Sequence, residues 1–135
     1  MAEHAFLDTN VIVYQYTQDD RGIVSETLFE NFDICLSVQV LNEFTNVARN
    51  KLKFSWPKID DAIDAIREAS SLIVPVLISD HDKARLFAAR YQLSIYDACI
   101  VACALATDCD TLFSEDMHDG MVIENRLTIQ NPFRT

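Results

Sequence analysis

Residues 5–16 read Ala5-Phe6-Leu7-Asp8-Thr9-Asn10-Val11-Ile12-Val13-Tyr14-Gln15-Tyr16, two apolar runs joined by three polar residues. The run 5–8 has the length and composition of a short buried strand, and 11–16 predicts the beginning of a helix. A strand that leads at once into a helix is the repeating unit of parallel α/β sheets. Asp8 closes the strand, where a carboxylate against a core is costly unless positive charge offsets it.

The rest of the chain alternates between the same two kinds of segment. The predicted helices cover 23–32, 38–49, 55–70, 79–91 and 97–107. The predicted strands cover 32–36, 71–78, 111–113, 121–123 and 127–129. This alternation predicts an α/β protein with three layers, in which helices flank a mostly parallel central sheet. We expect a single domain over 1–135, a length that suffices for one hydrophobic core.

Several helix and strand ends carry their own signals. Ser37 is a plausible N-cap for the helix that follows it. The segment 79–82 resembles a capping box that opens the helix predicted over 79–91. Pro75 lacks the N–H that a central strand needs, which indicates an edge strand around it.

The composition excludes several classes of protein. Half of the 135 residues are hydrophobic, and only two glycines and three prolines occur, so a disordered or collagen-like chain is excluded. The longest uncharged apolar stretch, 98–106, is too short to span a bilayer. No basic region opens the chain, so no secretory signal is visible, and we expect a cytoplasmic protein without membrane partners.

The four cysteines do not form a recognisable site. Cys35, Cys99, Cys103 and Cys109 include no Cys-x-x-Cys pair, and no His lies at zinc-finger spacing. Cys99 and Cys103 are one helical turn apart in an apolar run, as expected of small core residues. Neither a disulfide framework nor a zinc site is expected.

The net charge of −10 argues, taken alone, against a nucleic-acid partner, because phosphate binding needs Lys and Arg. The basic residues are unevenly spread, however. Four of the eleven, namely Arg49, Lys51, Lys53 and Lys58, lie in one short stretch. They are explained equally well by the negative end of the helix 38–49 and by contact with RNA.

Four acids stand apart from the other charges, since each borders an apolar run: Asp8, Glu43, Asp97 and Asp116. In an open parallel sheet, ligands bind at the carboxyl ends of the strands, and helix N-termini face the same edge. All four acids can converge there. Four carboxylates in one place call for a divalent cation, which makes metal-assisted phosphodiester chemistry the leading hypothesis.

Each acid also has a simpler explanation. Asp97 follows Ser94 by three positions and can complete a capping box, besides any metal role. Asp8 can form an Asx-turn, Asp116 can be solvated in an acidic loop, and Glu43 can pair with Arg49 or another base. Together these explanations leave open why all four acids abut strand ends or apolar helix faces.

On these residues, the chain resembles the PIN-domain nucleases, and within them the VapC-type toxins of toxin–antitoxin systems. The resemblance spans nearly the whole chain. It rests on the segments 6–14, Asn42-Glu43-Phe44, 96–104 and 111–117. The Asp-Thr-Asn start and the Tyr-Asp-Ala helix are specific in this order, whereas Asn-Glu-Phe alone is weak. The resemblance implies Mg²⁺- or Mn²⁺-dependent cleavage of RNA by an endoribonuclease.

The family pattern assigns roles to individual positions. Asp8, Glu43, Asp97 and Asp116 are the implied catalytic residues. Among them, Asp8 and Asp97 are the implied primary metal ligands, and Glu43 and Asp116 complete the site. The resemblance further implies that Thr9, Asn10 and Ser114 orient the acids or the scissile phosphate.

The resemblance also implies partners: an RNA substrate, a cognate VapB-like antitoxin and a second copy of the chain in a homodimer. The antitoxin would present a basic segment to the acids. An apolar groove that includes Tyr14, Tyr16, Leu28 and Phe29 is one candidate for its docking site. The alternative, that these are ordinary core residues, is preferred for Leu28 and Phe29.

Three other functions compete with the ribonuclease hypothesis. A phosphoacceptor receiver domain needs a second acid near the first strand end and a late lysine, and no lysine follows Lys83. A haloacid-dehalogenase-like phosphatase needs a second Asp where Asn10 stands. A non-catalytic PIN scaffold that only binds a partner remains the third.

Overall fold

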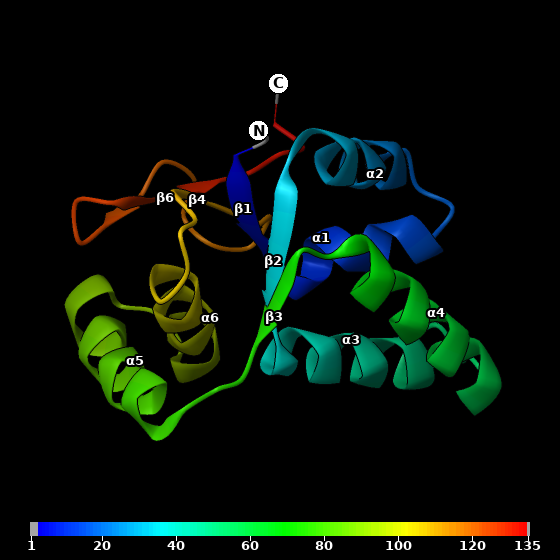
Figure 1. The fold of residues 1–135 in the computed structure, drawn as a ribbon, viewed down its shortest axis with the longest axis horizontal. Coiled ribbons are helices and arrows are strands. Elements are labelled where there is room, and N and C mark those ends of the chain that lie inside the picture. Colours follow the sequence, from blue (N-terminus) through cyan, green and yellow to red (C-terminus); the bar gives the residue numbers. More distant parts are fainter. Residues whose placement is uncertain (1–2, 135) are drawn as a thin grey trace.

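Strand β1 (His4–Leu7) lies inside a six-stranded sheet of order β3-β2-β1-β4-β6-β5 (Figure 1). The computed structural model describes residues 3–134. The other strands are β2 (Asp33–Ser37), β3 (Leu72–Val74), β4 (Thr111–Phe113), β5 (Val122–Ile123) and β6 (Leu127–Gln130). Neighbouring strands are parallel except β5, which runs antiparallel to β6. The predicted, mostly parallel sheet is confirmed.

Helices cover the sheet on two sides (Figure 1). They are α1 (Thr9–Val13), the 3₁₀ turn η1 (Tyr14–Tyr16), α2 (Arg21–Asn31), α3 (Val38–Asn50), α4 (Trp56–Ala69), α5 (Ile78–Tyr91) and α6 (Ile95–Leu105). Helices α5 and α6 pack against each other on one side, and α1 to α4 lie on the other. The three-layer α/β architecture predicted from the alternation is therefore present.

The core follows the apolar runs of the sequence. Ala5, Phe6 and Leu7 of β1 have no exposed surface, as expected for a strand with neighbours on both sides. Helix α6 is buried without interruption from Ala98 to Ala104, which matches its apolar composition. Strand β1 and helix α6 therefore place Asp8 and Asp97 at the border of the core.

Side-chain caps fix the beginnings of four helices. Asp8, Ser37, Ser55 and Ser94 each accept a hydrogen bond from a backbone N–H of the first turn. The predicted cap at Ser37 is thus confirmed. Such caps satisfy N–H groups that have no partner within the helix.

Two local predictions are wrong. The capping box predicted at 79–82 is not what opens α5, which begins at Ile78 with Leu77 at the cap position. The Asp80 carboxylate accepts the Leu77 N–H at 2.9 Å, but Leu77 offers no side-chain acceptor in return. The strand predicted over 71–78 ends at Val74, because Pro75 cannot extend the ladder. As Pro75 indicated, β3 is an edge strand.

The helix lengths and the cysteines bear on the class of protein predicted from the composition. Across residues 3–134, no helix has both the length and the apolar character required to cross a bilayer. All four cysteines are buried, and each carries a free thiol.

Candidate functional site

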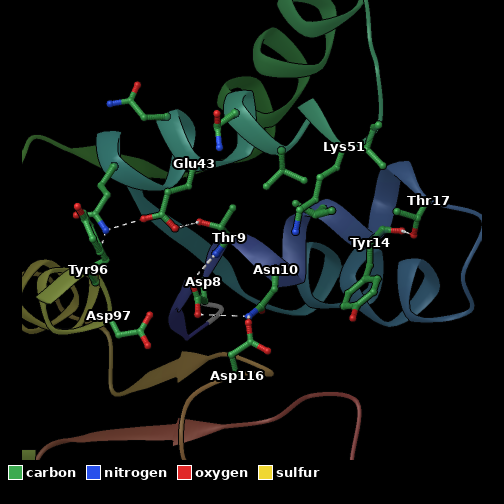
Figure 2. A pocket seen from close by; sticks show the side chains of 16 residues that line it. Asp8, Thr9, Asn10, Tyr14, Thr17, Glu43, Lys51, Tyr96, Asp97 and Asp116 are labelled. Carbon is green, nitrogen blue, oxygen red and sulfur yellow. Dashed lines mark hydrogen bonds between the residues drawn. The ribbon is translucent and has the colours of Figure 1, made fainter. Parts of the chain in front are cut away.

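The four predicted acids line one cavity of about 760 Å³ (Figure 2). Asp8 reaches it from the end of β1, and Asp116 from the loop after β4. Glu43 comes from the middle of α3 and Asp97 from the first turn of α6. The convergence expected at the carboxyl edge of the sheet is therefore observed, although the chain positions span more than a hundred residues.

Asp8 is the most buried of the four, with 4% of its surface exposed. Its Oδ1 accepts the Thr9 N–H at 2.7 Å, and its Oδ2 accepts the Ser114 hydroxyl at 2.7 Å. Burial raises the pKa of Asp8 from 3.8 to about 6, and the charges of Asp97 and Glu43 add to this, while the two hydrogen bonds oppose it. Asp8 thus caps α1 and also faces the other acids, so the Asx-turn explanation holds in addition to its place in the cavity.

Glu43 is half-buried and held by two donors. The Thr9 hydroxyl donates to its Oε1 at 3.1 Å, and Gln39 donates to its Oε2 at 2.7 Å. The alternative pairing of Glu43 with Arg49 is wrong. Arg49 lies over the Trp56 ring at 5.0 Å and donates to the Phe54 carbonyl at 3.1 Å.

Asp97 is the third residue of α6, and its N–H donates to the Ser94 hydroxyl at 3.1 Å. The backbone of Asp97 thus serves the helix cap, while its carboxylate lines the cavity. Burial, followed by the charges of Glu43 and Asp116, raises the pKa of Asp97. The cap and the cavity are compatible uses of one residue.

Asp116 is exposed and is held by Asn10, whose amide donates to its Oδ2 at 2.9 Å. The same amide nitrogen lies 3.5 Å from Oδ2 of Asp8, and the side-chain Oδ1 of Asn10 accepts the Glu115 N–H at 3.3 Å. Asn10 therefore connects the first strand end with the loop after β4. Each of Thr9, Asn10 and Ser114 contacts at least one of the four acids.

The four acids of the cavity are not neutralised by direct ion pairs among the described residues. Throughout residues 3–134, no ion pair involves Asp8, Glu43, Asp97 or Asp116. An all-oxygen carboxylate set of this kind suits Mg²⁺ or Mn²⁺ rather than a softer metal. The carboxylates are not yet grouped around a common point, however, because no three metal-ligating side chains among the described residues lie close enough together to hold an ion. The residue types fit a divalent cation, and binding one requires side-chain rotation.

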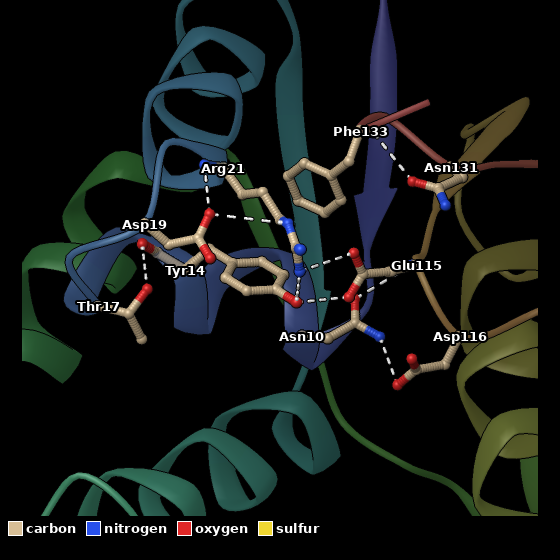
Figure 3. Close-up of polar contacts among 9 residues, drawn as sticks. All are labelled: Asn10, Tyr14, Thr17, Asp19, Arg21, Glu115, Asp116, Asn131 and Phe133. Atoms are coloured by element: carbon tan, nitrogen blue, oxygen red, sulfur yellow. Dashed lines mark hydrogen bonds and ion pairs between the residues drawn. The ribbon is translucent and has the colours of Figure 1, made fainter. Parts of the chain in front are cut away.

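Sequence reasoning missed several residues of this region. Gln39 donates hydrogen bonds to both Glu43 and the Tyr96 carbonyl. The only sign of this role in the sequence is that Gln39 lies one helical turn before Glu43. Tyr14 donates to Glu115, and Arg21 donates to both of them (Figure 3). This three-residue cluster joins η1, α2 and the loop after β4, which no local pattern could indicate.

The apolar groove proposed for Tyr14, Tyr16, Leu28 and Phe29 does not form as one surface. Leu28 is buried, Phe29 packs against the core, and Tyr16 packs edge-on against Phe44 and Phe54. The core interpretation preferred for Leu28 and Phe29 is confirmed. Of the four, Tyr14 alone lines the cavity.

Comparisons with known proteins agree with this architecture. The model of the PIN domain family matches residues 5–118. A search of curated proteins found no match. Among solved structures, the toxin VapC20 of Mycobacterium tuberculosis, described as cleaving the sarcin-ricin loop, is 18% identical with a TM-score of 0.66. The alignment covers 80% of this chain and 86% of VapC20.

Two further matches are to complexes. VapBC2 of Rickettsia felis, bound to a promoter DNA fragment, is 22% identical with a TM-score of 0.67, and the alignment covers 95% of this chain and 98% of the other. FitAcB of Neisseria gonorrhoeae is 16% identical with a TM-score of 0.67, covering 97% and 99%. At these identities, the similarity establishes the fold.

Proposed function

The chain belongs to the PIN-domain family, and we propose that it is a metal-dependent endoribonuclease that hydrolyses RNA phosphodiester bonds at the four-carboxylate cavity. One observation carries the proposal: carboxylates from four separate parts of the fold face one cavity without a cationic partner among the described residues. Uncompensated charge of this kind destabilises the protein, so its presence calls for a function.

Asp8 and Asp97 are the proposed ligands of Mg²⁺ or Mn²⁺, and Glu43 and Asp116 are proposed to complete the site. A cation held there would neutralise the carboxylates, polarise a phosphate oxygen and lower the pKa of a water ligand. The firm support of Asp8 by Ser114 and the Thr9 N–H keeps its oxygens in a fixed orientation.

The remaining acids are proposed to handle the proton of the attacking water. Thr9 and Gln39 hold Glu43, and Asn10 holds Asp116, at the lining of the cavity. Each bonded carboxylate oxygen accepts one of these hydrogen bonds and so retains a lone pair. Either carboxylate can accept the proton as water attacks the phosphorus opposite the leaving 3′-oxygen. The bond to that oxygen breaks, which leaves a 5′-phosphate and a 3′-hydroxyl.

We also propose that this protein is the toxin of a type II toxin–antitoxin pair in the cytoplasm, with a VapB-like antitoxin and a homodimeric assembly. The proposal is supported by the fold it shares with chains of VapBC and FitAB complexes. A cavity with excess negative charge also offers an inhibitory partner a place for a Lys or Arg side chain.

Cleavage of total cellular RNA in Mg²⁺ and in EDTA tests the enzymatic proposal. We expect new ends in Mg²⁺ alone, which ligation-based mapping should identify as 5′-phosphates. Equal cleavage in EDTA would exclude metal dependence. Absence of cleavage together with retained binding of a co-expressed antitoxin would favour the non-catalytic scaffold.

A further inference from the structure

The basic residues of the stretch 49–58, at the end of α3 and the start of α4, have different surroundings. Arg49 is stacked on Trp56, and the Nζ of Lys58 lies 4.0 Å from the centre of the Phe54 ring. Lys51 is different, because its side chain lines the acidic cavity (Figure 2). Among the described residues, no other Lys or Arg lines this cavity.

Lys51 is the C-cap residue of α3, where its N–H donates to the Val47 carbonyl. Its ammonium group has neither an ion pair nor an aromatic partner within residues 3–134. Val13, Val47 and Leu52 line the same part of the cavity wall. An unpaired cation is therefore presented beside an apolar surface in the cavity that also contains the acids.

The other cation near the cavity is already neutralised. Arg21 pairs with Glu115 at 3.2 Å and with Asp19 at 3.7 Å, and it lies 4.9 Å from the centre of the Tyr14 ring. It is absent from the cavity lining. Of these two side chains, Lys51 is the one available to an incoming anion.

A chain with a net charge of −10 repels RNA, so the few positive charges near the site matter for its binding. The proposed cation site can accept one phosphate, but an RNA strand brings several. A cavity of about 760 Å³ has the size of a small-molecule site and is far smaller than a double helix. It can admit one or two nucleotides of an unpaired strand.

We propose that Lys51 binds a backbone phosphate of the RNA next to the scissile one, so that one phosphate lies at the acids and the adjoining one at Lys51. This inference rests on the proposed ribonuclease function. Lys51 is a substrate-binding residue in this account and takes no part in proton transfer.

Binding measurements give the first test. In an Asp97→Asn background, which prevents cleavage, Lys51→Ala should weaken binding of a short single-stranded RNA about 5-fold at 0.1 M salt. The slope of log K against log salt should fall by about 0.7, the value for one phosphate contact on a single strand. Lys83→Ala is the matched control, because Lys83 is an exposed residue of α5 outside the cavity lining. It should leave the slope unchanged.

A phosphate scan gives the second test. Single phosphates of the RNA are replaced in turn by uncharged methylphosphonates, and cleavage in Mg²⁺ is measured for the wild type and Lys51→Ala. Replacement of one phosphate beside the scissile one should slow cleavage by the wild type by about the same factor as Lys51→Ala does. Combining that replacement with Lys51→Ala should cause no further loss of cleavage rate. Independent, multiplying effects at every position would overturn the contact.

The outcomes separate this inference from the function on which it rests. Wild-type protein that neither cuts nor binds RNA would remove both. Cleavage by the wild type with identical behaviour of Lys51→Ala and Lys83→Ala would remove the Lys51 contact alone.

Discussion

Asp8 shows how one residue combines a structural and a functional demand. It ends the central strand, caps α1 and is almost fully buried beside two other acids. Its pKa is raised from 3.8 to about 6, so the folded protein holds a proton on Asp8 more tightly than the unfolded chain does. Without metal, the stability contributed by this proton is fully present below pH 4 and is lost as the pH rises through 6.

Asp8→Asn should therefore stabilise the metal-free protein at pH 7. The interval between the two pKa values corresponds to at most about 3 kcal/mol. Urea unfolding in EDTA should show the variant more stable than the wild type at pH 7, with the difference closing towards pH 4. If the variant is less stable than the wild type at pH 7, the charge of Asp8 in the wild type is compensated within the fold.

Asp97→Asn tests the chemistry of the cavity. The change removes a proposed metal ligand but leaves the backbone N–H that bonds Ser94. Cleavage of RNA in Mg²⁺ should fall by at least about 100-fold, while the unfolding midpoint is not lowered, because the lost charge was an unfavourable one. Asp64→Asn, at an exposed position of α4 outside the cavity lining, should keep full activity. Equal activity of both variants would exclude Asp97 from the reaction.

At the scale of elements, prediction succeeded where the local signal was complete. The helix predicted over 97–107 is present as α6, two residues earlier at Ile95–Leu105, and Ser94 caps it as the capping-box alternative allowed. The start of α5 could not be read in the same way, because its cap position is occupied by Leu77 and the stabilising contact comes from Asp80. The length of β3 was overestimated because β-branched residues continue past Pro75 without pairing.

Ser94→Ala should lower the stability of α6 and disturb the position of Asp97. Loss of the hydroxyl leaves the Asp97 N–H without its acceptor, at a cost of about 1 kcal/mol. Chemical denaturation measures the loss. Ser94→Asp restores an acceptor and should recover most of the stability. Equal stability of Ser94→Ala and Ser94→Asp would refute the capping role.

Gly22 joins α2 to η1 through a close backbone contact. A Cβ at this position would lie 2.6 Å from the Tyr14 carbonyl oxygen, so Gly22→Ala must push η1 away from α2. We expect a loss of about 1–3 kcal/mol in unfolding free energy. Glu26→Ala, at an exposed site of the same helix, is the control and should stay within about 0.5 kcal/mol of the wild type. Similar values for the two variants would show that the contact relaxes freely.

For the whole molecule, the sequence predicted the convergence of the four acids because topology alone brings strand ends to one edge. The sequence could not predict which basic side chains line the cavity. Arg49, Lys51 and Lys58 are close together in the chain, yet Lys51 alone of the three lines the cavity. That separation depends on how α3 ends and on where Trp56 and Phe54 pack, which are tertiary features. The same holds for the cluster of Tyr14, Arg21 and Glu115.

The most direct measurement is the anomalous diffraction of Mn²⁺ in crystals grown at saturating Mn²⁺ and neutral pH. The account predicts a peak inside the cavity about 2 Å from carboxylate oxygens of both Asp8 and Asp97, with the Asp97 side chain rotated towards it. The peak should vanish in Asp97→Asn crystals. An empty cavity at saturating Mn²⁺, or an ion held elsewhere with all four acids left unbound, would contradict the account.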